Sequence, residues 1–159
     1  MSADAKFEDG GESPLRLRAL DVDDLAVISS LAQDAVFPGS EMTWDRSKRR
    51  FALLLNRFRW EDAPKATARK RPVERVQSVL VIEDAMNVQT SGVERGDADT
   101  VMSLLSLSFE AGEDGTGRLI LTLAGDGAIA VDVEALEVVL RDVTRPYVAP
   151  SHKTPHHEV

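Results

Sequence analysis

The segment RLILTLAGDGAIAVDV, residues 118–133, limits the possible folds of this chain more than any other stretch. Apolar residues alternate on both sides of Gly125-Asp126-Gly127, where glycine supplies the positive φ values that a tight reversal needs. We therefore expect a β-hairpin with one buried face. The side chains expected on that face are Leu119, Leu121, Leu123, Ile129, Val131 and Val133.

Other parts of the chain also predict strands. The segments with the composition or the two-residue period of strands are 15–20, 47–60, 73–93 and 101–109. Pro38-Gly39 indicates a turn between two extended pieces, and Glu83-Asp84 indicates a break within 73–93. We expect a polar turn over residues 93–100 and a loop over 110–117.

Residues 47–60, SKRRFALLLNRFRW, predict a long strand with two unequal faces. One face holds Phe51, Leu53, Leu55, Arg57 and Arg59, and the other holds Ala52, Leu54, Asn56, Phe58 and Trp60. The second set stays apolar to its end, so we expect it to face the core. The first set then becomes charged where the strand reaches the rim of the sheet. Residues 62–72, which follow, predict an exposed, mobile loop rich in Pro, Ala and basic residues.

Two segments predict helices. Asp21, with Asp24 three residues later, suits the N-cap of a helix that runs to about Leu31. Asp132 suits the cap of a last helix, from Val133 to about Val143. The apolar face expected for that last helix consists of Leu136, Val139, Leu140 and Val143.

This order of elements predicts an α+β fold dominated by an antiparallel β meander, with one early and one C-terminal helix. We expect a strongly bent sheet or open barrel of pleckstrin-homology-like architecture. The 159 residues suit one domain, which we place at residues 14–145. Residues 1–13 predict a disordered tail and residues 146–159 a flexible one.

Cysteine is absent, which excludes disulfides, thiol nucleophiles and thiolate metal sites. The first residues are acidic and Gly-rich and have neither the basic start nor the apolar stretch of a signal peptide. The longest uninterrupted apolar run, Phe51 to Leu55, is too short to span a bilayer. The N-terminal residues lead us to expect a cytoplasmic protein, and the short apolar run leads us to expect no membrane attachment.

Charge is distributed unevenly along the chain. The net charge is −8, yet residues 46–75 hold eleven basic and three acidic residues, a local charge of +8 that leaves −16 elsewhere. Trp44 and part of this region form the candidate binding set: Trp44, Arg46, Lys48, Arg49, Arg50, Asn56, Arg57, Arg59 and Trp60. Such residues can gather phosphates and stack bases. They also suit a solvated strand face, or arginines paired internally with Glu61 or Asp62.

No catalytic residue, metal site or cofactor emerges from the sequence. The histidines are His152, His156 and His157, within the last eight residues, where ligands are not held together. The glycine runs lack the pattern that cradles phosphates, since 112–117 has no following Lys-Ser/Thr. Capping and turns already account for the acidic clusters at 21–24 and 83–84.

Four segments resemble a family of small bacterial proteins of unknown function. They are DLAVISSLAQDAV, RRFALLLNRFRWE, VMSLLSLSFE and GAIAVDVEALEVVLRDV, in this order between Leu15 and Val143. The resemblance implies one compact domain and brings no activity, cofactor or catalytic residue with it.

Three functions remain open from the sequence. The first is a non-enzymatic module that binds another protein, or itself, through a sheet edge or the basic and aromatic surface. The second is an RNA- or phosphate-ligand-binding domain that uses Arg46–Arg75, although the net charge disfavours nucleic acid. The third is an enzyme with a carboxylate site that no motif reveals.

Overall fold

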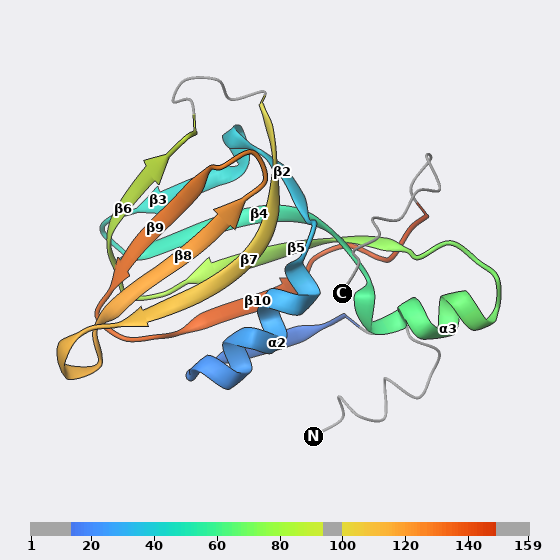
Figure 1. Ribbon diagram of the computed structural model, residues 1–159, viewed down its shortest axis with the longest axis horizontal. Helices are drawn as coiled ribbons and strands as arrows, with labels where there is room; N and C mark the ends of the chain where they lie inside the picture. The colour runs from blue at the N-terminus through green and yellow to red at the C-terminus, as the bar shows by residue number, and fades with distance from the viewer. Residues whose placement is uncertain (1–13, 94–99, 149–159) are drawn as a thin grey trace.

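The computed structural model of the protein describes residues 14–93 and 100–148, which form an antiparallel sheet with two α-helices (Figure 1). In chain order the elements are β1 (Arg16–Ala19), α2 (Val22–Ala32), β2 (Val36–Pro38), η1 (Gly39–Glu41), β3 (Met42–Asp45), β4 (Arg50–Phe58), η2 (Trp60–Asp62), α3 (Ala63–Ala68), β5 (Arg75–Ile82), β6 (Ala85–Ser91), β7 (Val101–Ala111), η3 (Glu113–Gly115), β8 (Gly117–Leu123), β9 (Ala128–Val133) and β10 (Val138–Asp142). The predicted α+β class with a mainly antiparallel sheet is therefore confirmed.

The sheet is open. Its strands lie in the order β1-β10-β5-β4-β2-β7-β8-β9-β6, and β3 pairs with β4 beside this path. Strand β2 joins the two halves, because Val36 pairs with Asn56 of β4 and with Ser103 of β7. The open order does not show the more specific pleckstrin-homology-like architecture that the sequence suggested.

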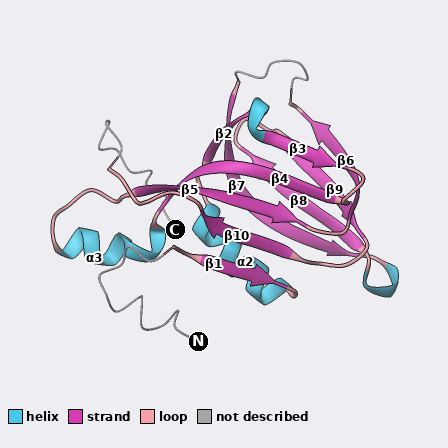
Figure 2. Ribbon diagram, turned by 180° about the vertical axis from the view of Figure 1, so that it is seen from behind, coloured by secondary structure: helices cyan, strands magenta, loops and turns pink. Residues whose placement is uncertain are grey.

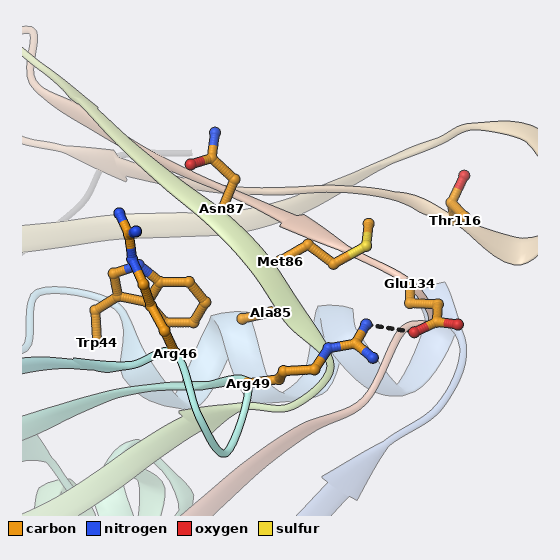
Figure 3. A pocket seen from close by; sticks show the side chains of 8 residues that line it. All are labelled: Trp44, Arg46, Arg49, Ala85, Met86, Asn87, Thr116 and Glu134. Atoms are coloured by element: carbon orange, nitrogen blue, oxygen red, sulfur yellow. Dashed lines mark hydrogen bonds and ion pairs between the residues drawn. The ribbon is translucent and has the colours of Figure 1, made fainter.

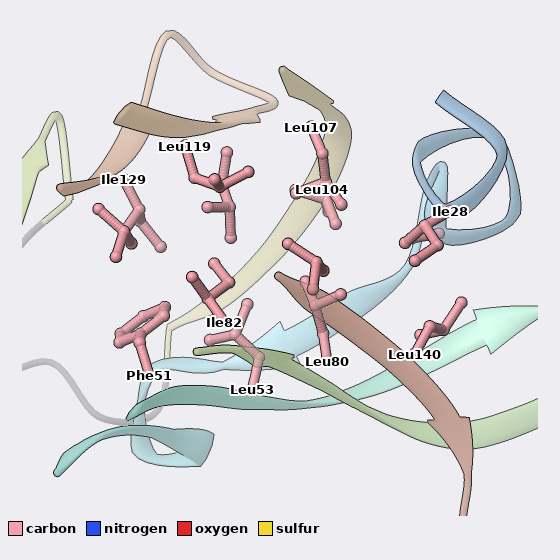
Figure 4. Close-up of a cluster of buried hydrophobic side chains, with 14 of the residues drawn as sticks. Ile28, Phe51, Leu53, Leu80, Ile82, Leu104, Leu107, Leu119, Ile129 and Leu140 are labelled. Carbon is pink, nitrogen blue, oxygen red and sulfur yellow. The ribbon is translucent and has the colours of Figure 1, made fainter. Parts of the chain in front are cut away.

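Both halves of the sheet contribute to one hydrophobic core (Figure 4). Leu53 of β4 and Ile82 of β5 lie opposite Leu119 of β8 and Ile129 of β9, and all four are almost completely buried. Ile28 extends the core to helix α2. Since full burial of such a side chain contributes about 1.5–3 kcal/mol, this core is the main source of stability.

Helix α2 lies against the middle of β7. It begins after Asp21, whose carboxylate accepts a hydrogen bond from the backbone N–H of Asp24 at 2.8 Å. The hydroxyl of Ser29 accepts the N–H of Leu107 at 2.9 Å. That bond satisfies a β7 donor beyond the residues that pair with β2. Helix α2 therefore replaces β2 as the neighbour of β7 in this part of the strand.

The hairpin of β8 and β9 forms where the sequence predicted it. All six side chains expected on its inner face are buried. Gly125 and Asp126 have φ values of 82° and 67°, so the turn uses the left-handed region at both positions. The break between β5 and β6 also lies as expected, with Asp84 at a φ of 54°.

The C-terminal segment is a strand, and the predicted helix over Val133–Val143 is wrong. Leu136 and Leu140 are four residues apart, a spacing that suits both a helix and one face of a strand. Strand β10 lies between β1 and β5, which pair with it on its two sides, and it buries Val138 and Leu140 on the core face. The second helix of the described residues is instead α3, in the middle of the chain.

Over Phe51–Leu55 the two faces of β4 are the reverse of the prediction, whereas Phe58, from the set expected to face the core, is buried. Phe51, Leu53 and Leu55 are buried, whereas Ala52 and Leu54 are half-exposed on the outer side. Arg57 belongs to the inner set and is completely buried. The prediction failed because this charged side chain finds partners inside the protein, as described below.

The predicted loop over residues 62–72 is partly helical. Residues Ala63–Ala68 form α3, and Ala66 is fully buried. Pro64 occupies the first turn, where its missing N–H costs no hydrogen bond. Lys65 and Thr67 are exposed, as the prediction of an accessible segment required.

Several predictions fall at or outside the limits of the described residues. The flexible tail was predicted to begin at residue 146, and the described part of it includes Tyr147. The backbone of Tyr147 exchanges two hydrogen bonds with Arg75, at 2.6 and 2.8 Å. The tail predicted over 1–13, most of the turn predicted over 93–100, and residues 149–159 with the three histidines lie outside the described ranges. Within residues 14–93 and 100–148, no helix is both long and apolar enough to cross a membrane.

Substitution of Leu140 tests the strand at the C-terminus. Leu140→Ala should lower the free energy of unfolding by about 2–5 kcal/mol, because it leaves a cavity in the core. The matched variant Val139→Ala, on the outer face, should cost about 1 kcal/mol or less. Urea denaturation measures both values. Equal losses of stability in the two variants would contradict the strand, because Val139 and Leu140 share one buried face only in the predicted helix.

Candidate functional site

A pocket of about 740 Å³ opens where β3 and β6 come close together (Figure 3). The side chains that line it come from four separate parts of the chain. They are Trp44, Arg46, Arg49, Ala85, Met86, Asn87, Thr116 and Glu134. Three residues of the candidate set, Trp44, Arg46 and Arg49, are among them.

The turn between β3 and β4 presents the two arginines. The carboxylate of Asp45 accepts hydrogen bonds from the Ser47 hydroxyl at 2.8 Å and the Lys48 N–H at 3.1 Å. These bonds lower the pKa of Asp45. Arg49 completes the reversal with a φ of 53°. The short polar loop is therefore held in one shape by a side chain at its start.

Backbone hydrogen bonds tie this turn to two others beside the pocket. The N–H of Ala85 donates to the carbonyl of Arg49 at 2.8 Å. The N–H of Glu134 donates to Asp84 at 3.0 Å, and that of Glu83 to Glu137 at 3.0 Å. The turns that follow β3, β5 and β9 thus form one connected wall.

The pocket lies between two sheet edges. Among the described residues, β3 pairs only with β4, and β6 pairs only with β9. Trp44 and Arg46 lie at the β3 edge, and Met86 and Asn87 lie on β6. An unpaired strand edge is a ready template for another strand.

The charges in the pocket are unequal. Arg49 forms an ion pair with Glu134 at its base, as the dashed line in Figure 3 shows. Arg46 is exposed and has no carboxylate partner in the described part of the chain. Trp44 and Met86 add apolar surface, and Met86 is 49% exposed. The arrangement can hold an anionic group beside an apolar one.

The rest of the candidate set lies away from this pocket. Arg50 pairs with Glu83 at 2.8 Å, and Lys48 is exposed on the turn without lining the pocket. Asn56 and Arg57 lie near the far end of β4, and Arg59 and Trp60 follow it. The two ends of this nine-residue strand are about 26 Å apart. The structure therefore divides the predicted site in two.

Arg57 is the centre of a buried network at that far end. Its guanidinium donates to Asp142 Oδ1 at 3.0 Å and to the Ser78 hydroxyl at 3.0 Å. It also makes two parallel bonds of 2.9 Å to the Glu61 carboxylate, and one of 3.1 Å to the Phe58 carbonyl. Every donor on the guanidinium side chain has a partner, which leaves none for a ligand.

Arg59 takes part in a second internal cluster. It pairs with Glu74 at 2.6 Å and lies 3.7 Å from Asp62. Arg71 forms an ion pair with Asp62 at 2.8 Å, and this interaction lowers the pKa of Asp62 and raises that of Arg71. One of the alternatives from the sequence was that these arginines pair internally with Glu61 or Asp62. The structure has this internal pairing, since Arg57 contacts Glu61 and Arg59 contacts Asp62.

Trp60 and its neighbours complete this end of the strand. The indole N–H of Trp60 donates to the carbonyl of Gln33 at 2.8 Å. Its ring lies 5.3 Å from that of Phe58, over which the Arg75 guanidinium is stacked at 4.4 Å. Asn56 Oδ1 is buried without a hydrogen-bond partner. Phe58 is buried and Trp60 is half-buried, so these rings pack mainly against the protein itself.

Sequence reasoning missed five pocket residues: Ala85, Met86, Asn87, Thr116 and Glu134. Each lies at a strand start or a turn, and its pattern carries no chemical motif. The turns at 83–84 and 110–117 were predictable, but their position beside the 46–49 turn depends on strand order, which periodicity does not give.

The comparisons with known proteins identify a family. The chain belongs to the family described as protein of unknown function (DUF2948), whose model matches residues 15–157. This confirms the resemblance to an unknown-function family that the sequence showed. No curated protein and no solved structure matches the chain.

Replacement of Arg57 tests whether its network is structural. Arg57→Met should lower the free energy of unfolding by about 3–5 kcal/mol, because it leaves Asp142 and Glu61 without their cation. The control Arg69→Met, at an exposed arginine after α3, should change it by less than about 0.5 kcal/mol. Similar small effects of both variants in urea denaturation would contradict a structural role for Arg57.

The network also predicts a pH dependence. Burial alone raises the pKa of Glu61, but the hydrogen bonds and charge of Arg57 outweigh it and hold that pKa below its ordinary value of 4.5. A lowered pKa stabilises the fold above the unfolded value, and the contribution is lost as pH falls through the folded value. Glu61→Gln should therefore be less stable than the wild type at pH 7. This difference should shrink as pH falls below about 4.5, whereas a constant difference in pH-dependent urea denaturation would exclude the linkage.

Proposed function

We propose that the protein is a non-catalytic binding module that holds an extended segment of a partner protein in the pocket between β3 and β6. The observation that carries this proposal is the place of the pocket between two strand edges that lack a partner in the described residues. An extended segment at such an edge gains main-chain hydrogen bonds, and neighbouring side-chain pockets give specificity.

The lining indicates the chemistry of the segment. Arg46 supplies a cation that has no carboxylate partner within residues 14–93 and 100–148, and Arg49 is already neutralised by Glu134. Trp44 and Met86 offer an aromatic and a thioether surface to an apolar side chain. A segment with a carboxylate next to an apolar residue fits these groups best.

The alternative functions have less support. Five arginines of the basic region, Arg49, Arg50, Arg57, Arg59 and Arg71, pair with carboxylates of the same chain, which removes charge that RNA or phosphate would require. For a carboxylate enzyme, a proton donor needs a raised pKa. Among the described residues, the carboxyl groups with a displaced pKa, at positions 45, 61 and 62, are all shifted down.

Disulfide tethering tests the pocket directly. The chain has no cysteine, so Met86→Cys places a single thiol at the pocket. It is screened against cysteine-containing tripeptides that carry either Asp or Lys, under increasing concentrations of reductant. Acidic tripeptides should stay attached at about tenfold more reductant than basic ones, because Arg46 attracts their carboxylate.

Two matched proteins make the result specific. Gln89→Cys places the thiol on an exposed residue of the same strand outside the pocket lining, and it should show no preference. Met86→Cys with Arg46→Glu should lose or invert the preference. Equal retention of acidic and basic tripeptides by Met86→Cys would contradict the proposed function.

A further inference from the structure

We propose that the outer face of β4, β5 and β10 is a second docking surface, for an acidic amphipathic helix of another protein. We call this surface the outer face. Its apolar residues are Ala52, Leu54, Val79, Val81 and Val139. Figure 2 shows this side of the sheet, and no helix of the described residues crosses it. The proposal goes beyond the pocket, because none of these residues lines it.

The sequences of these strands are typical of strands covered on both sides. FALLL in β4, VLVI in β5 and VVL in β10 are uninterrupted apolar runs. Strands with one solvated face alternate apolar with polar residues, whereas strands covered on both faces have continuous apolar runs. The inner members of each run form the core, and the outer members lie half-exposed side by side.

The other half of the sheet shows what a solvated outer face looks like in this protein. The outward residues here alternate between polar and apolar: Ser106 pairs with Thr122, and Ser108 and Gln89 lie in one row with Ile120 and Ala130 between them. An ion pair between Arg118 and Asp132, at 2.9 Å, lies on the same side. The outer face of β4, β5 and β10 has an uninterrupted apolar patch by contrast. Such a patch lowers solubility and is typical of an interaction site.

The dimensions of the apolar surface suit one helix. Leu54 pairs with Val79, and Val81 pairs with both Ala52 and Val139, so the apolar band is two residues deep along the strands. Two such rows are about 7 Å apart. Polar groups limit the band on both sides, with Gln77 at one end and the Arg50–Glu83 pair at the other. A helix about 10 Å wide covers this band, whereas a second sheet would meet polar residues.

Charge determines what kind of helix fits. Arg16 of β1 lies directly opposite Arg141 of β10, and both are exposed at the edge of the band. Like charges opposite each other destabilise a strand pair, and neither has a carboxylate partner among the described residues. A helix with carboxylates beside its apolar stripe removes this repulsion.

A second copy of the chain fits this surface less well. The carboxylates nearest the band are Glu83 and Glu137, and both are already paired, with Arg50 and Arg18. A second copy that docked through the same face would therefore bring its own Arg16 and Arg141 without free carboxylates beside them. Another protein, able to supply acidic residues, is the occupant that the charges favour.

Selection from a displayed library of helix-forming peptides, on the full-length protein, tests the outer face. Enriched peptides should have apolar residues at helical spacing, flanked by Asp or Glu. Binding of these peptides should weaken about tenfold or more in Val79→Thr/Val81→Thr, and separately in Arg16→Glu/Arg141→Glu. The first pair keeps the β-branched shape, and urea denaturation verifies that both variants fold.

Two control variants and three outcomes decide the matter. Ile120→Thr, on the outer side of β8, and Arg46→Glu, in the pocket, should leave peptide binding unchanged, which separates this test from that of the pocket.

The proposal is overturned if the enriched peptides bind both outer-face variants as tightly as the wild type. It is also overturned if light scattering shows a dimer that Val79→Thr/Val81→Thr dissociates. Binding that appears only after removal of residues 1–13 would assign the surface to that segment instead.

Discussion

The buried guanidinium of Arg57 is the constraint on which the rest of the structure depends. A charge with no exposed surface is tolerated only when its hydrogen bonds and its counter-charge are supplied together. Ser78 of β5, Asp142 at the end of β10 and Glu61 of η2 supply them. Asp142 also accepts the N–H of Leu15, immediately before β1, at 2.9 Å. One side chain thus fixes the mutual register of four strands and the direction in which the chain leaves β4.

The long-range contacts of Arg57 show why the sequence predicted some elements correctly and others wrongly. The cap at Asp21 and the hairpin at 118–133 depend on neighbours within a few residues, so local pattern identified them. Strand β10 depends on a partner 85 residues away, because Arg57 and Asp142 meet only in the folded sheet. The helical spacing of its apolar residues was a real pattern, but tertiary pairing overrode it. The inversion of the β4 faces has the same cause.

The candidate site was predictable in the same limited way. Trp44, Arg46 and Arg49 were identifiable because an aromatic residue and several cations lie close together in sequence. Met86, Thr116 and Glu134 come from three other parts of the chain, and only strand order brings them beside the turn after β3. Arg57 and Arg59 lie in sequence surroundings as basic and aromatic as those of the pocket residues Arg46 and Arg49. Burial alone separates them, and burial depends on partners that local sequence does not reveal.

Strand β4 is shared by the two proposed surfaces, and the buried network decides how they relate to each other. The turn before β4 supplies the pocket arginines, while Leu54 and Ala52 on its outer side contribute to the outer face. Coupling between two sites requires an element with two alternative arrangements. The bonds from Arg57 to Ser78 and Asp142 hold β4 against β5 and β10 in one arrangement, and any slip would expose an unpaired charge. Two partners would therefore bind independently on a rigid support, which is how a scaffold differs from a switch.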